Sequence, residues 1–267
     1  MTTAKTKQNP NSLAVFSSGA VIGSLGGLIG LGGAEFRLPL LIALFRFSAI
    51  EAIILNKAMS LVVVASALFF RSANIPFASI LAHQQIIFTL LSGSLIGAWL
   101  GADWVTRIQS QSLYKVIAVL LFGIAIILLS AHDVESGETA FNGWLLTATG
   151  AFAGLIIGLV ASVLGVAGGE LLIPTFVLLF GLDIKLAGSL ALIVSLPTML
   201  IGFVRFSRDK NFAVIARQKH FIVLMAIGSI LGAFIGGYLL GIVSSSILLP
   251  LLAGILVISA VKIWTHQ

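Results

Sequence analysis

The sequence contains no cysteine and few charged residues. The absence of cysteine excludes a disulfide scaffold, thiolate metal sites and cysteine nucleophiles. Charged residues make up 9% of the chain and hydrophobic residues 59%, whereas a soluble domain carries about 25% charged residues. This composition excludes a water-soluble enzyme, a disordered chain and a nucleic-acid-binding module, although the formal net charge is +6. The mean hydropathy of +1.15 indicates a polytopic membrane protein.

Long apolar runs fill most of the 267 residues. A run of about 20 apolar residues spans a bilayer as a helix. We expect membrane helices over Leu13–Leu31, Ile50–Phe70, Ile80–Leu100, Leu113–Ser130, Trp144–Leu164, Ala187–Phe206, Phe221–Leu240 and Ile247–Trp264. Two further runs, Phe36–Phe47 and Leu171–Leu182, are too short to span comfortably and are predicted to be half-helices.

The second half of the sequence repeats the first at a constant offset of 135 residues. Tandem halves of this kind are the usual plan of secondary transporters. The offset pairs Gly19 with Gly154, Gly23 with Gly158, Gly30 with Gly165, Gly33 with Gly168, Glu35 with Glu170, Pro39 with Pro174, Gly93 with Gly228, Gly97 with Gly232 and Gly101 with Gly236.

The charges of the loops predict that the two halves have opposite orientations. Lys and Arg near helix ends stay on the cytoplasmic side of a membrane. The loop between the sixth and seventh long runs is rich in Lys and Arg, whereas its counterpart in the first half is neutral apart from Arg71 at its edge. The central linker is acidic and has no basic residue, which suits the outside.

We therefore expect an all-α polytopic membrane protein with two inverted-topology repeats, each containing a glycine-broken helix pair and three transmembrane helices. The expected parts are a cytoplasmic tail at 1–12, a first repeat at 13–131, an external linker at 132–143 and a second repeat at 144–267, with both termini in the cytoplasm. A re-entrant hairpin and a short full crossing remain open for each broken pair.

Each half is broken once, at 30–39 and at 165–174, where glycines are followed by an acid and a proline. Glycine permits backbone angles that a helix forbids, and proline suits the first turn of a helix, so we expect a helix to start at each proline-containing segment. Helix amino ends attract anions. If inverted repeats bring the two ends together, an anion site results, with Gly32, Gly33, Ala34, Gly168 and Gly169 as candidate contacts. For the glycines at 93, 97 and 101 and their counterparts, close helix packing is the preferred role.

Two acidic and two basic residues fall within the apolar segments, where a charge usually faces a cavity or a partner. Glu35 and Glu170 either bind a coupling proton, because burial favours a neutral carboxyl group, or cap the helix starts. Arg37 and Lys57 are candidate contacts for an anionic substrate, with an ion pair or an interfacial position as the alternative. Asn56 is a candidate neutral donor, with a helix–helix hydrogen bond as the alternative.

The two glycine–proline motifs resemble the signature of the sulfite exporter TauE/SafE family of membrane permeases. The resemblance covers essentially the whole chain, and it implies transport of sulfite, a sulfonate or a related organic anion across a bacterial inner membrane. The chain departs from a pure glycine triplet at Ala34 and Ala167. The matching positions are Gly30, Gly32, Gly33 and Pro39 in the first half and Gly165, Gly168, Gly169 and Pro174 in the second.

Catalytic functions are disfavoured, because no phosphate-binding loop or nucleophile elbow occurs and the four histidines, His83, His132, His220 and His266, show no metal-ligand spacing. We expect no metal or cofactor and no nucleic-acid partner. The expected function is proton-coupled secondary transport of a small anion by alternating access, with export as the expected direction. One alternative is a cation-coupled or cation-transporting permease in which Glu35 and Glu170 bind Na⁺ or H⁺ directly. The others are an accessory membrane subunit that transports nothing and a channel.

Overall fold

The computed structural model consists of helices and their connections throughout the residues that it describes, which are 11–29, 33–72, 81–130, 142–182, 184–239, 254, 257–258 and 260–265. The helices are α1 (Ser12–Ile29), α2 (Ala34–Ala43), α3 (Ala49–Ser72), α5 (Gln84–Arg107), α6 (Ser110–Ser130), α7 (Trp144–Leu164), α8 (Gly169–Phe180), α9 (Ile184–Phe206), the 3₁₀-helix η2 (Lys210–Phe212), α10 (Ala213–Arg217) and α11 (Lys219–Leu239).

Four of these helices, α3, α5, α7 and α9, are long and apolar enough to cross a membrane. A fifth candidate span is formed by the segment from η2 to α11, which bends by 71°. The expected all-helical membrane architecture is therefore confirmed. The large apolar side chains that face outward, such as Trp144 at 79% and Phe234 at 74% exposure, are suited to contact with lipid.

The helix boundaries match the apolar runs most closely in the second half, where α7 has the expected limits. The run expected at 80–100 differs, because α5 begins at Gln84 and continues to Arg107. Its charged last turn is stabilised by an ion pair between Asp103 and Arg107, with 2.9 Å between the paired atoms. Residues 1–10 of the expected tail and most of the expected helix at 247–264 lie outside the described residues.

Both broken helix pairs fold back on themselves. The start of α1 lies beside the start of α11, where Ser12 Oγ and His220 Nε2 are 3.4 Å apart. The chain that leaves α2 returns to the same place, because Phe45 and Phe47 pack edge-on against Phe221. In the second pair, the ring of Phe180 at the end of α8 lies beside Gly150, near the start of α7.

The two short helices reach only part of the way along their hairpins. α2 has 10 residues and α8 has 12, which at 1.5 Å per residue gives about 15 and 18 Å, roughly half the thickness of a bilayer core. The glycines that precede them lie beside inner turns of the preceding helix: Gly33 adjoins Ile22 of α1, and Gly168 adjoins Ile157 and Ala161 of α7. Both short helices thus start part of the way along the preceding helix.

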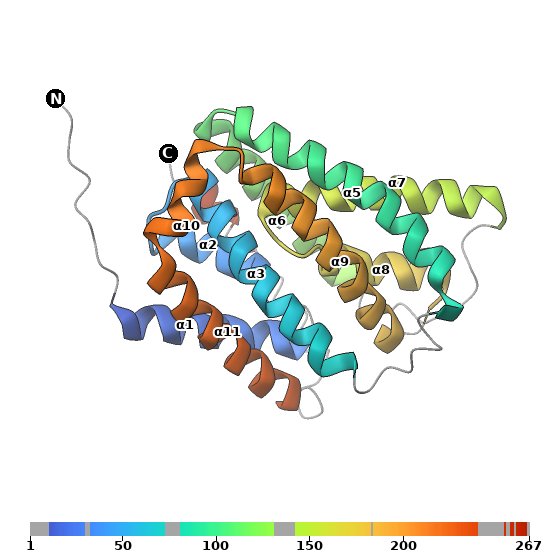
Figure 1. Ribbon diagram of the computed structural model, residues 1–267, viewed down its shortest axis with the longest axis horizontal. Coiled ribbons are helices and arrows are strands. Elements are labelled where there is room, and N and C mark those ends of the chain that lie inside the picture. Colours follow the sequence, from blue (N-terminus) through green and yellow to red (C-terminus); the bar gives the residue numbers. More distant parts are fainter. Residues whose placement is uncertain are drawn as a thin grey trace.

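The first helix of each half packs against a helix of the other half, α1 against α11 and α7 against α5 (Figure 1). Glycines let the backbones touch, because a Cβ atom at these positions would overlap a carbonyl group of the opposite helix. The contacts of one pair reproduce those of the other under the offset of 135. In the α1–α11 pair, Gly19 adjoins Met225, Gly23 adjoins Ser229, Gly228 adjoins Phe16 and Gly232 adjoins Ala20. In the α5–α7 pair, the equivalent contacts, in the same order, are Gly154 with Leu90, Gly158 with Ser94, Gly93 with Ala151 and Gly97 with Leu155.

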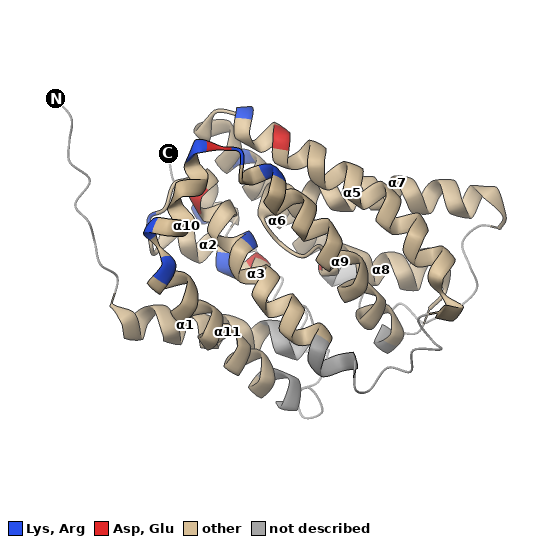
Figure 2. Ribbon diagram, in the orientation of Figure 1, with Lys and Arg blue, Asp and Glu red and all other residues tan. Residues whose placement is uncertain are grey.

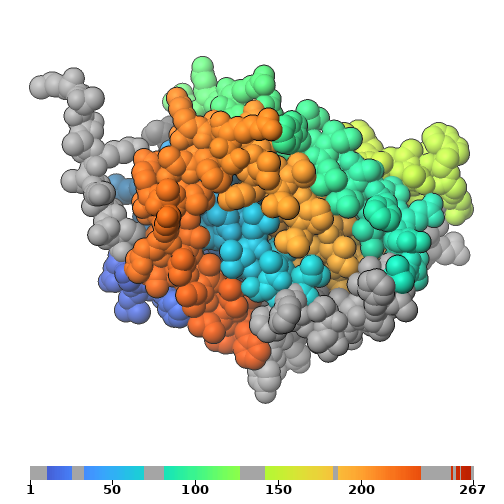
Figure 3. Space-filling model, viewed as in Figure 1, coloured from blue at the N-terminus to red at the C-terminus, as the bar shows by residue number. Residues whose placement is uncertain are grey.

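Helices α3 and α9 pack against each other between these two pairs. The halves are interleaved at the surface as well, where atoms of α3 lie between those of α9 and of α10 and α11 (Figure 3). Charged residues gather at one end of the bundle, around α10 and the ends of α5 and α9, while α1 and α7 carry none along their lengths (Figure 2). We call this end the basic end and define it by Arg107, Arg205, Arg208, Lys210 and Arg217.

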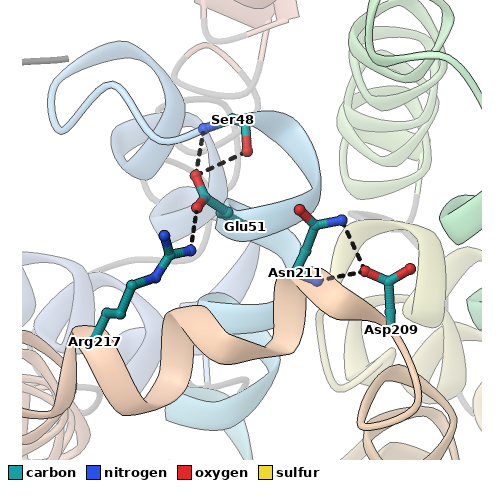
Figure 4. A network of polar contacts seen from close by, with 5 residues as sticks. All are labelled: Ser48, Glu51, Asp209, Asn211 and Arg217. Carbon is teal, nitrogen blue, oxygen red and sulfur yellow. Dashed lines mark hydrogen bonds and ion pairs between the residues drawn. The ribbon is translucent and has the colours of Figure 1, made fainter. Parts of the chain in front are cut away.

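Polar contacts at the basic end join elements of the first half to elements of the second. Glu51 in the first turn of α3 accepts a 2.9 Å hydrogen bond from Arg217 of α10 and another from the hydroxyl of Ser48 (Figure 4). Asp103 of α5 accepts hydrogen bonds from Arg205 at the end of α9. These contacts hold the segment 207–218 against α3 and the end of α9 against α5.

Candidate functional site

The amino ends of α2 and α8 are shaped by glycines in the left-handed conformation. Gly33 precedes α2 with a φ of 69° and Gly168 precedes α8 with a φ of 79°, a conformation that costs other residues energy. Neither glycine supplies a side-chain cap, so the orphan N–H groups of the first turn remain for other acceptors. The expected breaks are present at both positions.

The prolines lie deeper in the short helices than expected. Pro39 and Pro174 are each the sixth residue of their helix, not part of the first turn. A proline in a helix removes the N–H that would bond to the carbonyl four residues earlier, and in both helices that earlier residue is the glutamate, Glu35 or Glu170. The glycine, not the proline, therefore determines where each helix starts.

Asn56 joins the two breaks. Its amide nitrogen donates to the carbonyl of Ala34, the first residue of α2, at 2.9 Å, and to the carbonyl of Leu164, the last residue of α7, at 3.2 Å. The asparagine is fully buried. Since one nitrogen contacts both segments, the start of α2 and the end of α7 meet at a single place inside the protein.

Arg37 is fully buried and extends from α2 to helices of both halves. Its guanidinium donates to Asn56 at 3.3 Å and Ser60 at 3.1 Å, both on α3, and to Ser229 on α11 at 3.3 Å. These three acceptors are neutral oxygens, whose dipoles solvate the positive charge, and the guanidinium also interacts electrostatically with Glu35.

Lys57 places a second buried charge at the end of α7. Its ammonium group donates to the carbonyl of Ala161 and to the hydroxyl of Ser162, each at 3.3 Å. The carboxyl end of a helix carries partial negative charge, which stabilises a cation there. Lys57 thus caps α7 directly before the second break.

Glu35 and Glu170 occupy equivalent positions, each the second residue of its short helix. Their exposures are 0% and 1%, and the two carboxyl groups are close enough to interact electrostatically. Their four carboxyl oxygens have no hydrogen-bond partner of ordinary geometry among the described residues. Both expected roles of these residues, proton binding and capping of the helix starts, stay predictions.

The cationic and amide side chains of the first half have apolar counterparts in the second. Leu172, Ala191 and Leu192 stand where the first half has Arg37, Asn56 and Lys57. A cavity of about 10 Å³ lies between α8 and α9 and is lined in part by Gly169 and Ser195, and it holds at most one water molecule. The two halves therefore contribute different groups to the site, whose side chains are buried.

The structure brings most of the predicted site residues to one buried place. These are Gly33, Ala34, Glu35, Arg37, Asn56, Lys57, Gly168, Gly169 and Glu170, whereas Gly32 lies outside the described residues. The sequence analysis did not identify Ser162 and Ser229, which contact Lys57 and Arg37. The offset of 135 pairs Ser229 with Ser94, another buried serine on a glycine-lined helix face, and that repetition was the available signal.

No group of three histidine, aspartate or glutamate side chains that could hold a metal ion occurs within the described part of the chain. Comparisons with curated proteins and with solved structures each returned no match. The family described as sulfite exporter TauE/SafE matches residues 15–263. This range covers nearly the whole chain and includes both breaks. The family is one of membrane transporters for sulfite and similar anions, and the chain belongs to it: this is a member of the sulfite exporter TauE/SafE family.

Proposed function

We propose that the protein is a proton-coupled secondary transporter that moves a small sulfur-containing or organic anion, such as sulfite or a sulfonate, out of the cell across a bacterial inner membrane. The anion binds at mid-depth between the amino ends of α2 and α8, and the site is exposed to the two sides in alternation. The observation that carries this proposal is the meeting of two uncapped helix starts with the buried cations Arg37 and Lys57.

Anion binding at this place follows from elementary electrostatics. Uncapped helix starts present N–H donors and partial positive charge. The planar guanidinium of Arg37 suits the oxygens of a sulfonate or carboxylate, and its present acceptors are neutral groups that an anion can replace. Gly33, Ala34, Gly168 and Gly169 permit close approach to the backbone, and Asn56 supplies a neutral donor.

The arrangement of the helices supports inverted halves with a cytoplasmic basic end. α1 begins at the end of the bundle where α11 begins, which is the basic end. α7 begins beside the end of α8, from which the 23-residue helix α9 runs to the basic end. Basic helix ends stay in the cytoplasm, so both termini are assigned to that side and the linker to the outside.

The proposed function is tested by binding and by flux. Thermal stability of the detergent-purified protein is measured with sulfite, sulfate, methanesulfonate, acetate and phosphate, because a ligand of the native state raises the unfolding temperature. Proteoliposomes then report saturable uptake and counterflow of any anion that stabilises the protein. If none of these anions stabilised the protein and none were transported, anion transport would be refuted.

Lys57 and Lys262 provide a matched pair for the binding site. Lys57 is buried at the second break, whereas Lys262 is exposed near the end of the chain. We expect Lys57→Ala to abolish the anion-induced rise in unfolding temperature and Lys262→Ala to preserve it. Equal effects of the two substitutions would remove Lys57 from the site.

Na⁺ is a second candidate for the coupling ion. Carboxyl oxygens without hydrogen-bond partners among the described residues are also suitable ligands for Na⁺, a hard cation that prefers oxygen. A sodium gradient imposed at constant pH distinguishes the two ions: proton coupling predicts no effect on anion accumulation, and sodium coupling predicts that the gradient drives it.

A further inference from the structure

Glu35 and Glu170 form a symmetric pair with an unusual environment. The carboxyl groups come from equivalent positions of the two repeats and interact with each other. Both side chains are at most 1% exposed, and their oxygens accept no hydrogen bond of ordinary geometry from the described residues. Asn56 shows independently that the segments around them adjoin, since it binds both the residue before Glu35 and the end of α7.

The charges that face this pair do not neutralise it fully. Arg37 on α2 interacts with Glu35, and it also donates hydrogen bonds to neutral oxygens on α3 and α11. Lys57 on α3 donates to the end of α7. Helices α7 and α11 contribute the neutral serines Ser162 and Ser229 to these contacts. One cation therefore lies beside two carboxyl groups.

Two interacting carboxyl groups in a buried place cannot both ionise at ordinary cost. A like charge at short range and the loss of hydration both disfavour the second ionisation, as in other paired-acid sites, where two carboxyl groups share one proton. With one proton, the net charge of Glu35, Glu170 and Arg37 is zero. With none it is −1, and with two it is +1.

From this geometry we infer that Glu35 and Glu170 act as one carboxyl pair that holds a single proton in the closed state. One group is the carboxylic acid and the other is the carboxylate, and the proton is common to both repeats. The pair is thus one proton-binding site, not two independent ones.

The consequence for coupling rests on the proposed function. A bound monoanion adds one negative charge beside Arg37, and a second proton on the carboxyl pair cancels that charge. Anion and proton therefore bind together and leave together. The cycle moves one proton with each monovalent anion, so net charge movement is zero, and export proceeds when the outward anion gradient exceeds the inward proton gradient.

Infrared spectroscopy tests the carboxyl pair without any substrate. The carbonyl band of protonated carboxylic acids is measured as a difference between the wild type and the variant E35Q/E170Q in lipid nanodiscs. At neutral pH we expect half of the band intensity that the same difference reaches in acid, where both groups are protonated. No band or a full band at neutral pH would overturn the inference.

Single variants test whether the proton is shared. E35Q and E170Q should each alter the same band, because the proton belongs to both groups. If one of them left the band unchanged, the two acids would be independent and the inference wrong. Glu51→Gln is the matched control, since Glu51 pairs with Arg217 at the basic end, and it should leave the difference band intact. The single variants also replace the double variant if that one does not fold.

Flux measurements test the coupling ratio separately. Methanesulfonate is the probe, because it stays a monoanion over the working pH range. A pH gradient should drive its accumulation in proteoliposomes, and a potassium diffusion potential should not. Accumulation driven by the potential would overturn the ratio of one. If methanesulfonate does not move but the infrared band is present, the carboxyl pair stands and sulfonate transport fails.

Discussion

At the scale of single residues, Asn56 of α3 connects the start of α2 to the end of α7. It donates to Ala34 of α2 and Leu164 of α7 and accepts from Arg37. Replacing Asn56 by alanine leaves buried carbonyls without these donors, which costs about 1–2 kcal/mol of stability. We expect Asn56→Ala to lower the unfolding temperature of the detergent-purified protein and to weaken anion binding.

Asn211 provides the control for this substitution. It lies in η2, is half-buried and donates to Asp209 (Figure 4). Asn211→Ala should change the unfolding temperature much less than Asn56→Ala. A larger loss of stability from Asn211→Ala would show that Asn56 does not join the breaks.

At the scale of elements, the helix pairs α1–α11 and α5–α7 depend on bare backbone contact. A methyl group at Gly158 would overlap the carbonyl of Ser94, and one at the equivalent Gly23 would overlap that of Ser229. The helices must separate to accept it, at a cost of about 1–3 kcal/mol. We expect Gly23→Ala and Gly158→Ala to lower the unfolding temperature by similar amounts.

Gly123 in α6 offers the opposite case, because among the described residues no atom outside the neighbouring backbone of α6 lies within 4 Å of the position where its Cβ would be. Alanine forms helices better than glycine by about 1 kcal/mol, so Gly123→Ala should leave the unfolding temperature unchanged or raise it. Equal destabilisation by all three substitutions would mean that close packing is not the reason for the glycines in the helix pairs.

At the scale of the whole molecule, the structure is closed, and its two halves are tied together at the basic end. The ties are Asp103 with Arg205 and Glu51 with Arg217. Because the chain has no cysteine, Ser195→Cys reports directly on access to the buried site. We expect slow labelling by a membrane-impermeant maleimide. Adding Arg205→Gln should accelerate it about fivefold, the effect of roughly 1 kcal/mol on a two-state equilibrium.

Ser207→Cys is the matched control, since Ser207 is exposed just after the end of α9. Its cysteine should react rapidly, and equally so with and without Arg205→Gln. If Ser195→Cys reacted as fast as Ser207→Cys with the basic end intact, the closed conformation would not be the resting one.

The sequence was sufficient to predict the breaks, because a glycine cluster, an acid and a proline recur at one offset and no continuous helix accommodates them. It also predicted the burial of Arg37 and Lys57, which follows from their positions in apolar segments. The hydrogen-bond partners of these cations were not predictable. Ser229 meets Arg37 across 192 positions of sequence, and only the packing of α11 against α1 brings them together.

The helix ends show the same division between local and tertiary causes. α5 extends beyond its apolar run to Arg107, because Asp103 finds cationic partners in its own helix and in α9. The run of apolar residues contains no information about Arg205. The position of the prolines was misjudged for a local reason: a left-handed glycine starts each short helix before the proline is reached.

The pairing of α1 with α11 has a consequence for biosynthesis. Helix α1 is made first, but the helix that covers its glycine face is completed only at Leu239. During translation the first helix must wait in the lipid while about 200 further residues emerge, roughly 10–40 s at ordinary ribosome speeds. The first half thus leaves the ribosome with a bare face, and the last helices to emerge complete its fold.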